Sequence, residues 1–276
     1  MPDPRYRQIA EDLRQKIESG ELGHGDQLPT EFDLREQYGS SRNTVRDAVK
    51  WLITRGLVET RPGQGTFVAD KIDPFVTILD RELGYGGGDG SAYYASEVKE
   101  RSRVATVSPP RVEIHLASSA LAGRLRLEEG AQVISRHQRR YIDGTLWSLQ
   151  TTFYPMRYVD AGARRLIEAA DLPDGAVRYL EETLGIEQIG WQDKITVRAP
   201  NATEATVFKL PDDGRVAVVE INRTAFEKSG SPLRLTVTVY PADRNQFVTH
   251  VGKVPADADD HVSAMDPIGE LTTQGP

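Results

Sequence analysis

The stretch SSRNTVRDAVKWL, residues 40–52, decides the fold of the first third of the chain. Its apolar residues recur every three or four positions, at Val45, Ala48, Val49 and Leu52. The opposite side of the helical wheel carries polar side chains, at Arg42, Asn43, Arg46 and Lys50. With about 3.6 residues per turn, this pattern predicts an amphipathic helix with one buried and one basic face. The basic face needs an explanation, because the whole chain of 276 residues has a formal net charge of -7 at pH 7.

The positive charge is confined to a short part of the chain. Between residues 34 and 61, six Lys and Arg residues face only three acidic ones, as a single docking surface for an anion requires. The composition, 38% hydrophobic and 27% charged, is that of a globular protein long enough for two domains. Cysteine is absent, and neither a signal peptide nor an apolar run of membrane-spanning length is present. We therefore expect a cytoplasmic protein that does not cross a membrane.

The residues around the opening stretch predict a winged helix-turn-helix domain over 1–70. A first helix is expected at about 4–19, and a short second helix lies between Thr30, a good N-cap, and Gly39. Ser40 or Ser41 caps the third helix, which continues to about Arg55. Two β-prone runs then flank the turn sequence at 62–65 and predict a hairpin.

The remainder of the chain predicts an α+β domain behind a linker. The Gly-rich stretch GYGGGDGSA, residues 84–92, is typical of a linker, which we assign to 71–96. Domain 97–250 follows, with strands expected near 97–107, 132–142, 146–155, 188–199, 215–228 and 232–241. Its helices are expected near 111–124, 158–169, 175–184 and 201–208. Residues 251–276 are acidic and poor in aromatic residues, and we expect a disordered tail.

Several motifs resemble a known family. Residues 6–68 resemble the DNA-binding domain of GntR-type bacterial transcription regulators, through Leu-Pro-Thr-Glu at 28–31, Ser-Arg-x-Thr-Val-Arg at 41–46 and Gly-x-Gly-Thr-Phe-Val at 63–68. Residues 97–245 resemble the effector-binding (UTRA) domain of the HutC subfamily, mainly through RHQRRYIDGTLWSLQTTFYP and SPLRLTVTVYPADRNQF. The resemblance implies a second domain with a mixed antiparallel sheet and helices, a fold shared with chorismate lyase. It also implies a homodimer that binds a DNA operator and a small-molecule effector without a cofactor.

The third helix and the wing supply the candidate DNA contacts. Side chains at the start of a recognition helix can reach base edges in the major groove, which suits Arg42 and Arg46 to guanine and Asn43 to adenine. Hydroxyl groups suited to phosphates lie at Tyr6, Thr30, Ser41 and Thr44. The wing residues that can approach the minor groove are Arg61, Gly63, Gln64 and Gly65. A merely solvated helix face is the alternative, but it leaves the turn, the cap and the wing unexplained.

Polar residues alternate with apolar ones along three strands of the second domain. The polar faces comprise Arg136, Gln138 and Arg140, then Ser148, Gln150, Thr152 and Tyr154, then Arg234, Thr236, Thr238 and Tyr240. Each of these faces is compatible with a plain solvent-exposed sheet. Taken with the resemblance, they suggest the lining of a ligand cleft.

The effector candidates are Arg136, Arg140, Gln150, Thr152, Tyr154, Arg234 and Tyr240. The resemblance implies that relatives sensing phosphorylated amino sugars tend to carry Glu where this chain has Gln150 and Arg234. Arg140 and Tyr240 match the family pattern. Two fewer carboxylates and one more guanidinium favour a carboxylate or phosphate ligand. We therefore expect an anionic effector different from those amino sugars.

Three other functions remain open from the sequence. A chorismate-lyase-like enzyme is one, but the five histidines have no metal-ligand spacing and no nucleophile or phosphate-loop motif is present. We expect neither catalytic residues nor a metal site. A GntR-type head with an all-helical or aminotransferase-like partner domain is the second alternative, which the strand-rich pattern disfavours. A DNA-binding protein without a ligand is the third.

The sequence thus predicts a ligand-responsive regulator that acts as a repressor. A homodimer would bind a two-fold symmetric operator with half-sites about 10 bp apart. Effector would release it by binding one arrangement of the two heads more tightly than the other. The linker at 71–96 is the expected transmitter of this change.

Overall fold

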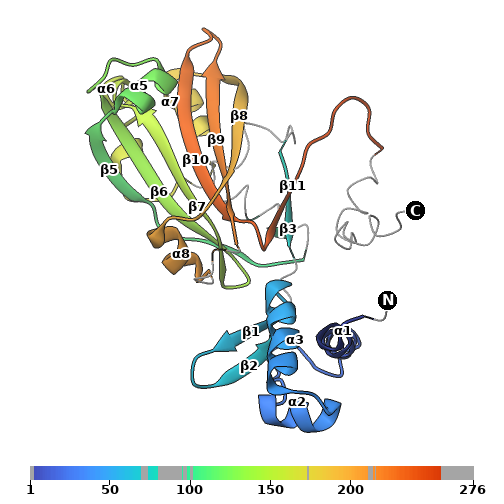
Figure 1. Cartoon of the computed structure of the whole chain (residues 1–276). Helices are drawn as coiled ribbons and strands as arrows, with labels where there is room; N and C mark the ends of the chain where they lie inside the picture. The colour runs from blue at the N-terminus through green and yellow to red at the C-terminus, as the bar shows by residue number, and fades with distance from the viewer. Residues whose placement is uncertain are drawn as a thin grey trace. The chain divides into compact units, whose positions relative to one another are not determined.

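The computed structural model describes residues 3–69, 74–79, 95, 98–99, 102–172, 174–210, 214 and 216–255. The chain forms two compact units, Met1–Asp73 and Pro74–Pro276 (Figure 1). We call the first unit the head and the second unit the sheet domain, and we describe each by itself.

Residues 3–69 of the head form three helices and a hairpin, as the sequence predicts. Its elements are α1 (Arg5–Glu18), α2 (Glu31–Tyr38), α3 (Arg42–Thr54), β1 (Val58–Arg61) and β2 (Gly65–Val68). The apolar stripe of the opening stretch is buried, with Val45, Ala48 and Leu52 fully enclosed against residues of α1 and α2. The predicted amphipathic helix is therefore confirmed, and its apolar side forms the core of the head.

Side-chain caps fix the starts of α2 and α3, and a glycine ends α2. Thr30 and Asp33 form a reciprocal capping box at the start of α2, with Thr30 Oγ1 accepting from the Asp33 amide. Ser41 caps α3 by accepting from the Thr44 amide at 3.2 Å. Gly39 ends α2 with φ +58°, a left-handed conformation that glycine adopts readily. These local interactions set where α3 begins and so which of its residues are exposed.

We expect Tyr38→Phe to destabilise the head by about 1 kcal/mol. The Tyr38 hydroxyl donates to Asp12 on α1, and this hydrogen bond is the main reason that the pKa of Asp12 is lowered. A carboxyl group whose pKa is lowered in the folded state stabilises the protein fully at pH values above its ordinary pKa. This stabilisation is lost as the pH falls through the lowered pKa. Native-state hydrogen exchange at the α1 amides should be roughly fivefold faster in the variant at neutral pH, with a smaller difference in acid. Equal exchange rates at neutral pH would contradict this role for Tyr38.

The sheet domain has one large sheet and a separate strand pair. Its strands are β3 (Phe75–Ile78), β4 (Ala105–Val107), β5 (Arg111–Leu116), β6 (Gln132–Ile142), β7 (Thr145–Pro155), β8 (Gln188–Arg198), β9 (Val218–Glu227), β10 (Pro232–Pro241) and β11 (Asn245–Val248). The helices whose bounds lie within the described residues are α5 (Ser119–Leu125), α6 (Arg157–Asp160), the 3-10 turn η1 (Arg164–Ile167), α7 (Ala176–Leu184) and α8 (Ala202–Phe208).

The large sheet is antiparallel throughout. Its strand order is β4-β6-β7-β10-β9-β8, with β5 also paired to β6 (Figure 1). Asp143 and Gly144 join β6 to β7 with positive φ at both positions, as the Asp-Gly sequence predicts for a tight hairpin turn. β3 and β11 form a small parallel pair of their own. The predicted α+β class is thus confirmed.

Helices cover both faces of the large sheet. On one face, α5 packs through Leu121 and Leu125 against Val133 and Leu235. α8 contributes Phe208 to a second cluster, with residues of β9 and β10. On the other face, α6, η1 and α7 pack against β6 and β7 in a cluster that includes Leu166 and Leu180. The second face is the one that carries the predicted polar residues.

Three predicted elements were wrong in part. Residues 111–116 form β5 rather than the start of a helix over 111–124, and only 119–125 are helical. The alternation of Val112, Ile114 and Leu116 with polar residues is the strand signal that the helix prediction overlooked. The predicted helix at 158–169 divides into α6 and η1, because Gly162 between them has φ +121°. Of the strand predicted near 97–107, the described residues contain only 105–107.

The predicted linker and tail lie mostly outside the described residues. Phe75–Ile78, inside the stretch predicted as linker, forms β3 and pairs with β11 near the end of the described chain. Residues 80–94 and 256–276 are not described. Residues 251–255 carry no helix or strand.

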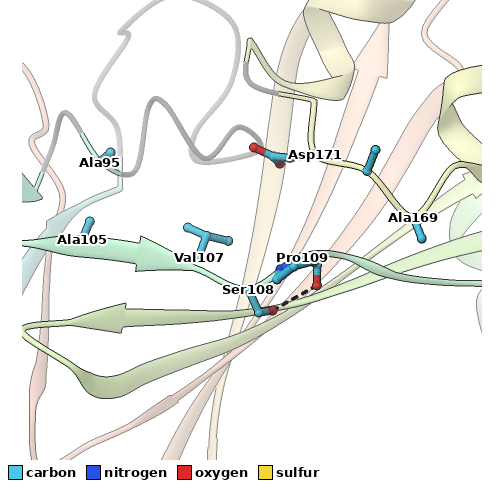
Figure 2. Close-up of a pocket in the computed structure, with 8 residues that line it drawn as sticks. Ala95, Ala105, Val107, Ser108, Pro109, Ala169 and Asp171 are labelled. Atoms are coloured by element: carbon cyan, nitrogen blue, oxygen red, sulfur yellow. Dashed lines mark hydrogen bonds between the residues drawn. The ribbon is translucent and has the colours of Figure 1, made fainter.

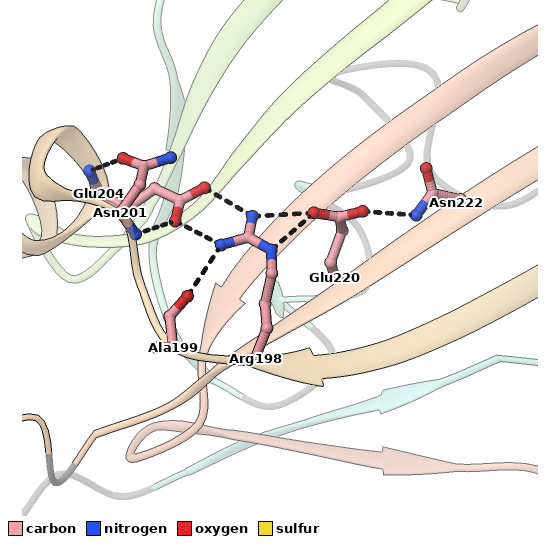
Figure 3. A network of polar contacts seen from close by, with 6 residues as sticks. All are labelled: Arg198, Ala199, Asn201, Glu204, Glu220 and Asn222. Carbon is pink, nitrogen blue, oxygen red and sulfur yellow. Dashed lines mark hydrogen bonds and ion pairs between the residues drawn. The ribbon is translucent and has the colours of Figure 1, made fainter. Parts of the chain in front are cut away.

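A network of charged side chains fastens α8 to the sheet (Figure 3). Arg198, the last residue of β8, makes two hydrogen bonds of 2.7 Å to Glu204 in the first turn of α8. It also pairs with Glu220 on β9 at 2.8 Å. Glu204 in turn accepts from the Asn201 amide and so completes the capping box of α8. Hydrogen bonds from Arg198 lower the pKa of Glu204, whose side chain is 9% exposed.

Candidate DNA-binding and effector-binding sites

The start of α3 presents the predicted base-reading side chains to solvent. Arg42, Asn43 and Arg46 are exposed, and the side chains of the two arginines are 68% and 61% accessible. Ser41 and Thr44 lie beside them and share a hydrogen bond of 2.8 Å between their hydroxyl groups. The structure therefore brings all five residues together on the first turn and a half of one helix.

The start of α2 adds a residue that the sequence analysis did not select. Glu31 accepts from Arg42 Nε at 3.1 Å and pairs with Arg46 Nε at 3.4 Å. Thr30, the predicted phosphate contact, is exposed and caps α2 immediately before Glu31. The Leu-Pro-Thr-Glu motif contained the signal, but only the packing of α2 beside α3 shows which arginines Glu31 meets.

The wing is the hairpin of β1 and β2, and its tip contacts the body of the head. Gln27 Nε2 donates to the Gln64 carbonyl at 2.8 Å, and a Cβ at Gly65 would lie 2.5 Å from the same nitrogen. Gly65 also has φ +125°, a backbone conformation that favours glycine, whereas the close atom belongs to the end of the flexible Gln27 side chain. Arg61 lies over the Phe67 ring at 4.3 Å and pairs with Glu59 at 2.8 Å.

The remaining candidates in the head are Gly63 and Tyr6. Gly63 lies at the hairpin tip with φ +72°. Tyr6 on α1 is half-buried and packs against the core of the head.

The polar residues of the sheet domain share one face of three neighbouring strands. Arg136 on β6 lies opposite Thr152 on β7, which lies opposite Thr236 on β10. The next row joins Gln138, Gln150 and Thr238. We call this surface, which also holds Arg140, Ser148, Tyr154, Arg234 and Tyr240, the polar face. The predicted alternation is therefore confirmed by the strand register.

The polar face is buried, which excludes the plain solvent-exposed sheet that the sequence left open as an alternative. Arg136 is 7% exposed, Arg140 6%, Gln150 4% and Arg234 0%. The segment after β7 supplies part of the cover, because Arg136 donates to the carbonyls of Leu166, Glu168 and Ala170 at 2.6–2.8 Å. Sequence alternation identifies a shared face but cannot show which later segment folds over it.

Hydrogen bonds connect residues of the polar face across strands. The hydroxyl groups of Thr152 and Thr236 are 3.1 Å apart, and Arg234 donates to Thr236 at 2.6 Å. Arg223 on β9 continues the same row and forms a two-pronged pair with Asp193 on β8 at 2.6 and 2.8 Å. Arg223 also donates to the carbonyl of Leu79, directly after β3. The sequence analysis missed Arg223 and Asp193, whose partnership depends on pairing across 30 residues.

A cavity of about 420 Å³ lies at the margin of the polar face (Figure 2). Its wall consists of Ala95, Ala105, Val107, Ser108, Pro109, Ala169, Ala170 and Asp171. A smaller cavity of about 10 Å³ is lined by Arg136, Gln138, Thr152, Tyr154, Asp171, Leu172 and Ala176. Asp171 belongs to both walls, and Gln138 donates to it at 3.5 Å and to the Ser108 carbonyl at 3.3 Å. Space for a ligand therefore adjoins the arginine-bearing strand β6.

The effector candidates divide into two groups. Arg136, Thr152 and Tyr154 line the smaller cavity. Arg140, Gln150, Arg234 and Tyr240 share the polar face with them but have other surroundings, such as the ring contact of Tyr240 with Phe247 at 5.0 Å.

Family comparisons agree with this geometry. Residues 5–68 match the family described as bacterial regulatory proteins, gntR family, and residues 102–246 match the UTRA domain. The chain is a GntR-type transcriptional regulator with a UTRA effector-binding domain.

Two relatives match this GntR-type regulator over nearly its whole length, and a third matches a quarter of it. The transcriptional repressor NagR of Bacillus subtilis is 46% identical over 92% of this chain and 97% of its own. A helix-turn-helix regulator of Streptomyces coelicolor, described as uncharacterized, is 31% identical over 92% of this chain and 95% of its own. MngR of Escherichia coli, repressor of a mannosyl-D-glycerate transport and metabolism system, is 46% identical, but over only 25% of this chain and 28% of its own.

Solved structures place this GntR-type regulator in the same fold. PhnF of Mycobacterium smegmatis has a TM-score of 0.53 at 25% identity and covers 89% of this chain and 100% of its own. Another GntR-family crystal structure has a TM-score of 0.62 at 26% identity and covers 91% and 99%. These relatives are regulators rather than enzymes, in agreement with the sequence expectation.

Within the described ranges, no helix of this regulator is long and apolar enough to cross a membrane. The same residues contain no cluster of three His, Asp or Glu side chains suited to a metal ion.

Proposed function

We propose that this regulator is a repressor that binds a palindromic operator as a homodimer and is released by a small anionic effector. The exposed face of α3 carries the proposal, because it presents Arg42, Asn43 and Arg46 at the start of a capped recognition helix. The names of NagR and MngR support repression rather than activation. Since the target would be chromosomal DNA, the same proposal locates the protein in the cytoplasm.

In the proposed complex, α3 enters the major groove. Arg42 and Arg46 would each take guanine O6 and N7, and Asn43 would take adenine N6 and N7. Ser41, Thr44, Thr30 and Tyr6 would contact phosphates, which fix orientation without specifying sequence. Arg61, Gly63, Gln64 and Gly65 of the wing would approach the minor groove. Two heads related by a two-fold axis would contact half-sites about 10 bp apart.

Genomic footprinting with the purified protein tests the DNA part of this proposal. We expect protected sites that contain an inverted repeat, and a complex whose mass by light scattering corresponds to two chains per duplex. Protection without any common sequence would point instead to a DNA-binding protein that lacks an operator. One chain per duplex at saturation would contradict the homodimer.

The effector part rests on the charge of the polar face. Arg136 is buried and donates to main-chain carbonyls, which carry only partial charges and leave the unit charge of the guanidinium in place. In surroundings of low dielectric this charge acts over a longer range than in water. Arg140 and Arg234 share the face with Arg136. An anion that enters beside β6 would therefore gain electrostatic energy from these guanidinium groups.

The same contacts suggest how binding could change the protein. The carbonyls that hold Arg136 belong to the segment that also forms a wall of the 420 Å³ cavity. An anion that competes for this guanidinium would favour another position of that segment. Such a ligand shifts the operator-binding equilibrium only by the ratio of its affinities for the two arrangements. We propose that residues 71–96 carry the change to the heads.

A thermal-shift screen of small anions should identify the effector class, because a ligand of the native state raises its apparent stability. The panel includes carboxylates, phosphorylated sugars and glucosamine-6-phosphate. We expect an anion other than glucosamine-6-phosphate to stabilise the protein and to release it from the operator. Tight calorimetric binding of glucosamine-6-phosphate, with the other anions inert, would overturn the proposed effector class.

Arg140→Gln should preserve operator binding and abolish release by the effector. Arg139→Gln is the matched control, because Arg139 directly precedes Arg140 in β6, has the same charge and is exposed on the other face. Gln150→Glu provides a second variant. Its added carboxylate repels an anion and should lower the affinity for the effector roughly tenfold or more. Normal release in both Arg140→Gln and Gln150→Glu would exclude Arg140 and Gln150 from the effector site.

A further inference from the structure

Glu31 occupies a distinctive position between the two arginines proposed to read bases. Its two carboxylate oxygens contact different arginines, Oε2 with Arg42 and Oε1 with Arg46. The two arginines are one turn apart on α3, whereas Glu31 belongs to α2. One carboxylate on a neighbouring helix thus bridges both guanidinium groups.

The contacts use the guanidinium nitrogen that lies nearest the chain. In both pairs the arginine atom is Nε, at 3.1 Å for Arg42 and 3.4 Å for Arg46. A guanidinium that approaches guanine O6 and N7 end-on uses its two terminal nitrogens, which these contacts do not occupy. Glu31 can therefore support both side chains while they contact bases.

The position of Glu31 is itself well fixed. The capping box at the start of α2 is formed by Thr30 and Asp33, on either side of Glu31. The Glu31 side chain takes no part in this cap. Its carboxylate is therefore held at the start of a short capped helix and directed toward α3.

A role in fold stability does not account for this arrangement. The side chains of Glu31, Arg42 and Arg46 are 44%, 68% and 61% accessible, and exposed ion pairs stabilise proteins only weakly. At a DNA surface the same carboxylate has a larger effect. It restricts two flexible side chains before binding, and it repels phosphates wherever the arginines do not find their bases.

We propose that Glu31 is a specificity-determining residue, which positions Arg42 and Arg46 for base contact and lowers affinity for DNA of the wrong sequence. This inference rests on the proposed DNA contacts of the two arginines. On a matched site, both arginines bind guanine while Glu31 supports them through Nε. On an unmatched site, the negative charge of Glu31 remains beside the DNA backbone without that compensation.

The test compares two duplexes with full-length protein: an operator duplex selected by the unaltered protein, and a duplex of the same composition in scrambled order. Fluorescence anisotropy gives both affinities between roughly 50 and 200 mM salt, since phosphate contacts depend on salt. We expect Glu31→Gln to bind the scrambled duplex about fivefold more tightly and the operator no more tightly, so that the affinity ratio falls about five- to tenfold. The melting temperature should remain close to that of the unaltered protein.

Two further variants separate positioning from net charge. Glu36→Gln removes the same charge from an exposed position on the same helix, and it should change both affinities alike. Glu31→Asp keeps the charge but is one methylene shorter, so it should fail to reach both arginines. It should lower the affinity for the operator more than the affinity for the scrambled duplex.

Each outcome bears on the assignment. An unchanged affinity ratio in Glu31→Gln, or an equal fall in Glu36→Gln, would overturn the role of Glu31. Failure of the proposed DNA contacts is a distinct result: the unaltered protein would then select no duplex at all, and the Glu31 assignment would fall with it.

Discussion

Arg46→Ala should weaken operator binding by about 1–3 kcal/mol, roughly 5- to 150-fold, and should relax the base preference at one position of each half-site. Arg46 is exposed on the first turns of α3 and lies beside Arg42 across the Glu31 carboxylate. Alanine removes two hydrogen bonds to a guanine as well as a positive charge. Arg42→Ala should behave similarly at a neighbouring base. Gel shifts with the operator and with single-base variants of it measure both the loss and the relaxation.

Arg55→Ala supplies the control for net charge. Arg55 follows the last residue of the same helix, where its guanidinium lies over the Trp51 ring at 3.5 Å. We expect a smaller loss of affinity that is equal for all sequences, because a distant charge affects only the general attraction to phosphates. Unchanged affinity for Arg42→Ala and Arg46→Ala alike would refute the assignment of α3 as the recognition helix.

Glu204→Ala should lower the free energy of unfolding of the sheet domain by about 3 kcal/mol. The variant removes two hydrogen bonds to Arg198 and one to the Asn201 amide, and it leaves a guanidinium that is largely enclosed. The loss should be less than for a fully buried pair, because Arg198 retains Glu220 and is 32% exposed. Trp147 and Trp191 report unfolding of this domain in a Trp51→Phe background, since the chain has three tryptophans.

Both a control and the pH dependence check this result. Glu182→Ala breaks an exposed pair with Arg178 on α7, and its effect should not exceed about 0.5 kcal/mol. The pKa of Glu204 is lowered from 4.5 by its hydrogen bonds from Arg198. The contribution of Glu204 to the free energy of unfolding is therefore complete at pH values above 4.5, and it is lost as the pH falls through the lowered pKa. The difference between the variant and the unaltered protein should shrink in acid, and equal stability at neutral pH would exclude a stabilising role for the network.

Local chemistry made the head predictable from the sequence. The stripe at Val45, Ala48 and Leu52, the caps at Thr30 and Ser41 and the turn after Arg61 each depend on residues a few positions apart. Because these signals act within one or two turns, they fixed the helices, the hairpin and the exposed side of α3. The partnership of Glu31 with two arginines was not predictable, since it depends on how α2 packs beside α3.

The sheet domain shows the limit of such reasoning. Alternation along β6, β7 and β10 placed the polar residues on one face, because side chains of a strand alternate whatever their neighbours are. It could not show that residues 164–170 fold over Arg136 or that Asp193 lies opposite Arg223.

The sequence by itself determined the two-domain architecture, the amphipathic helix α3 and the shared face of the effector candidates, since periodicity and capping are local properties. Only the tertiary structure decided that the polar face is buried and that the larger cavity lies beside it. It also decided that one carboxylate pairs with both arginines proposed to read bases. Contacts between segments distant in the chain depend on packing, which no local pattern encodes.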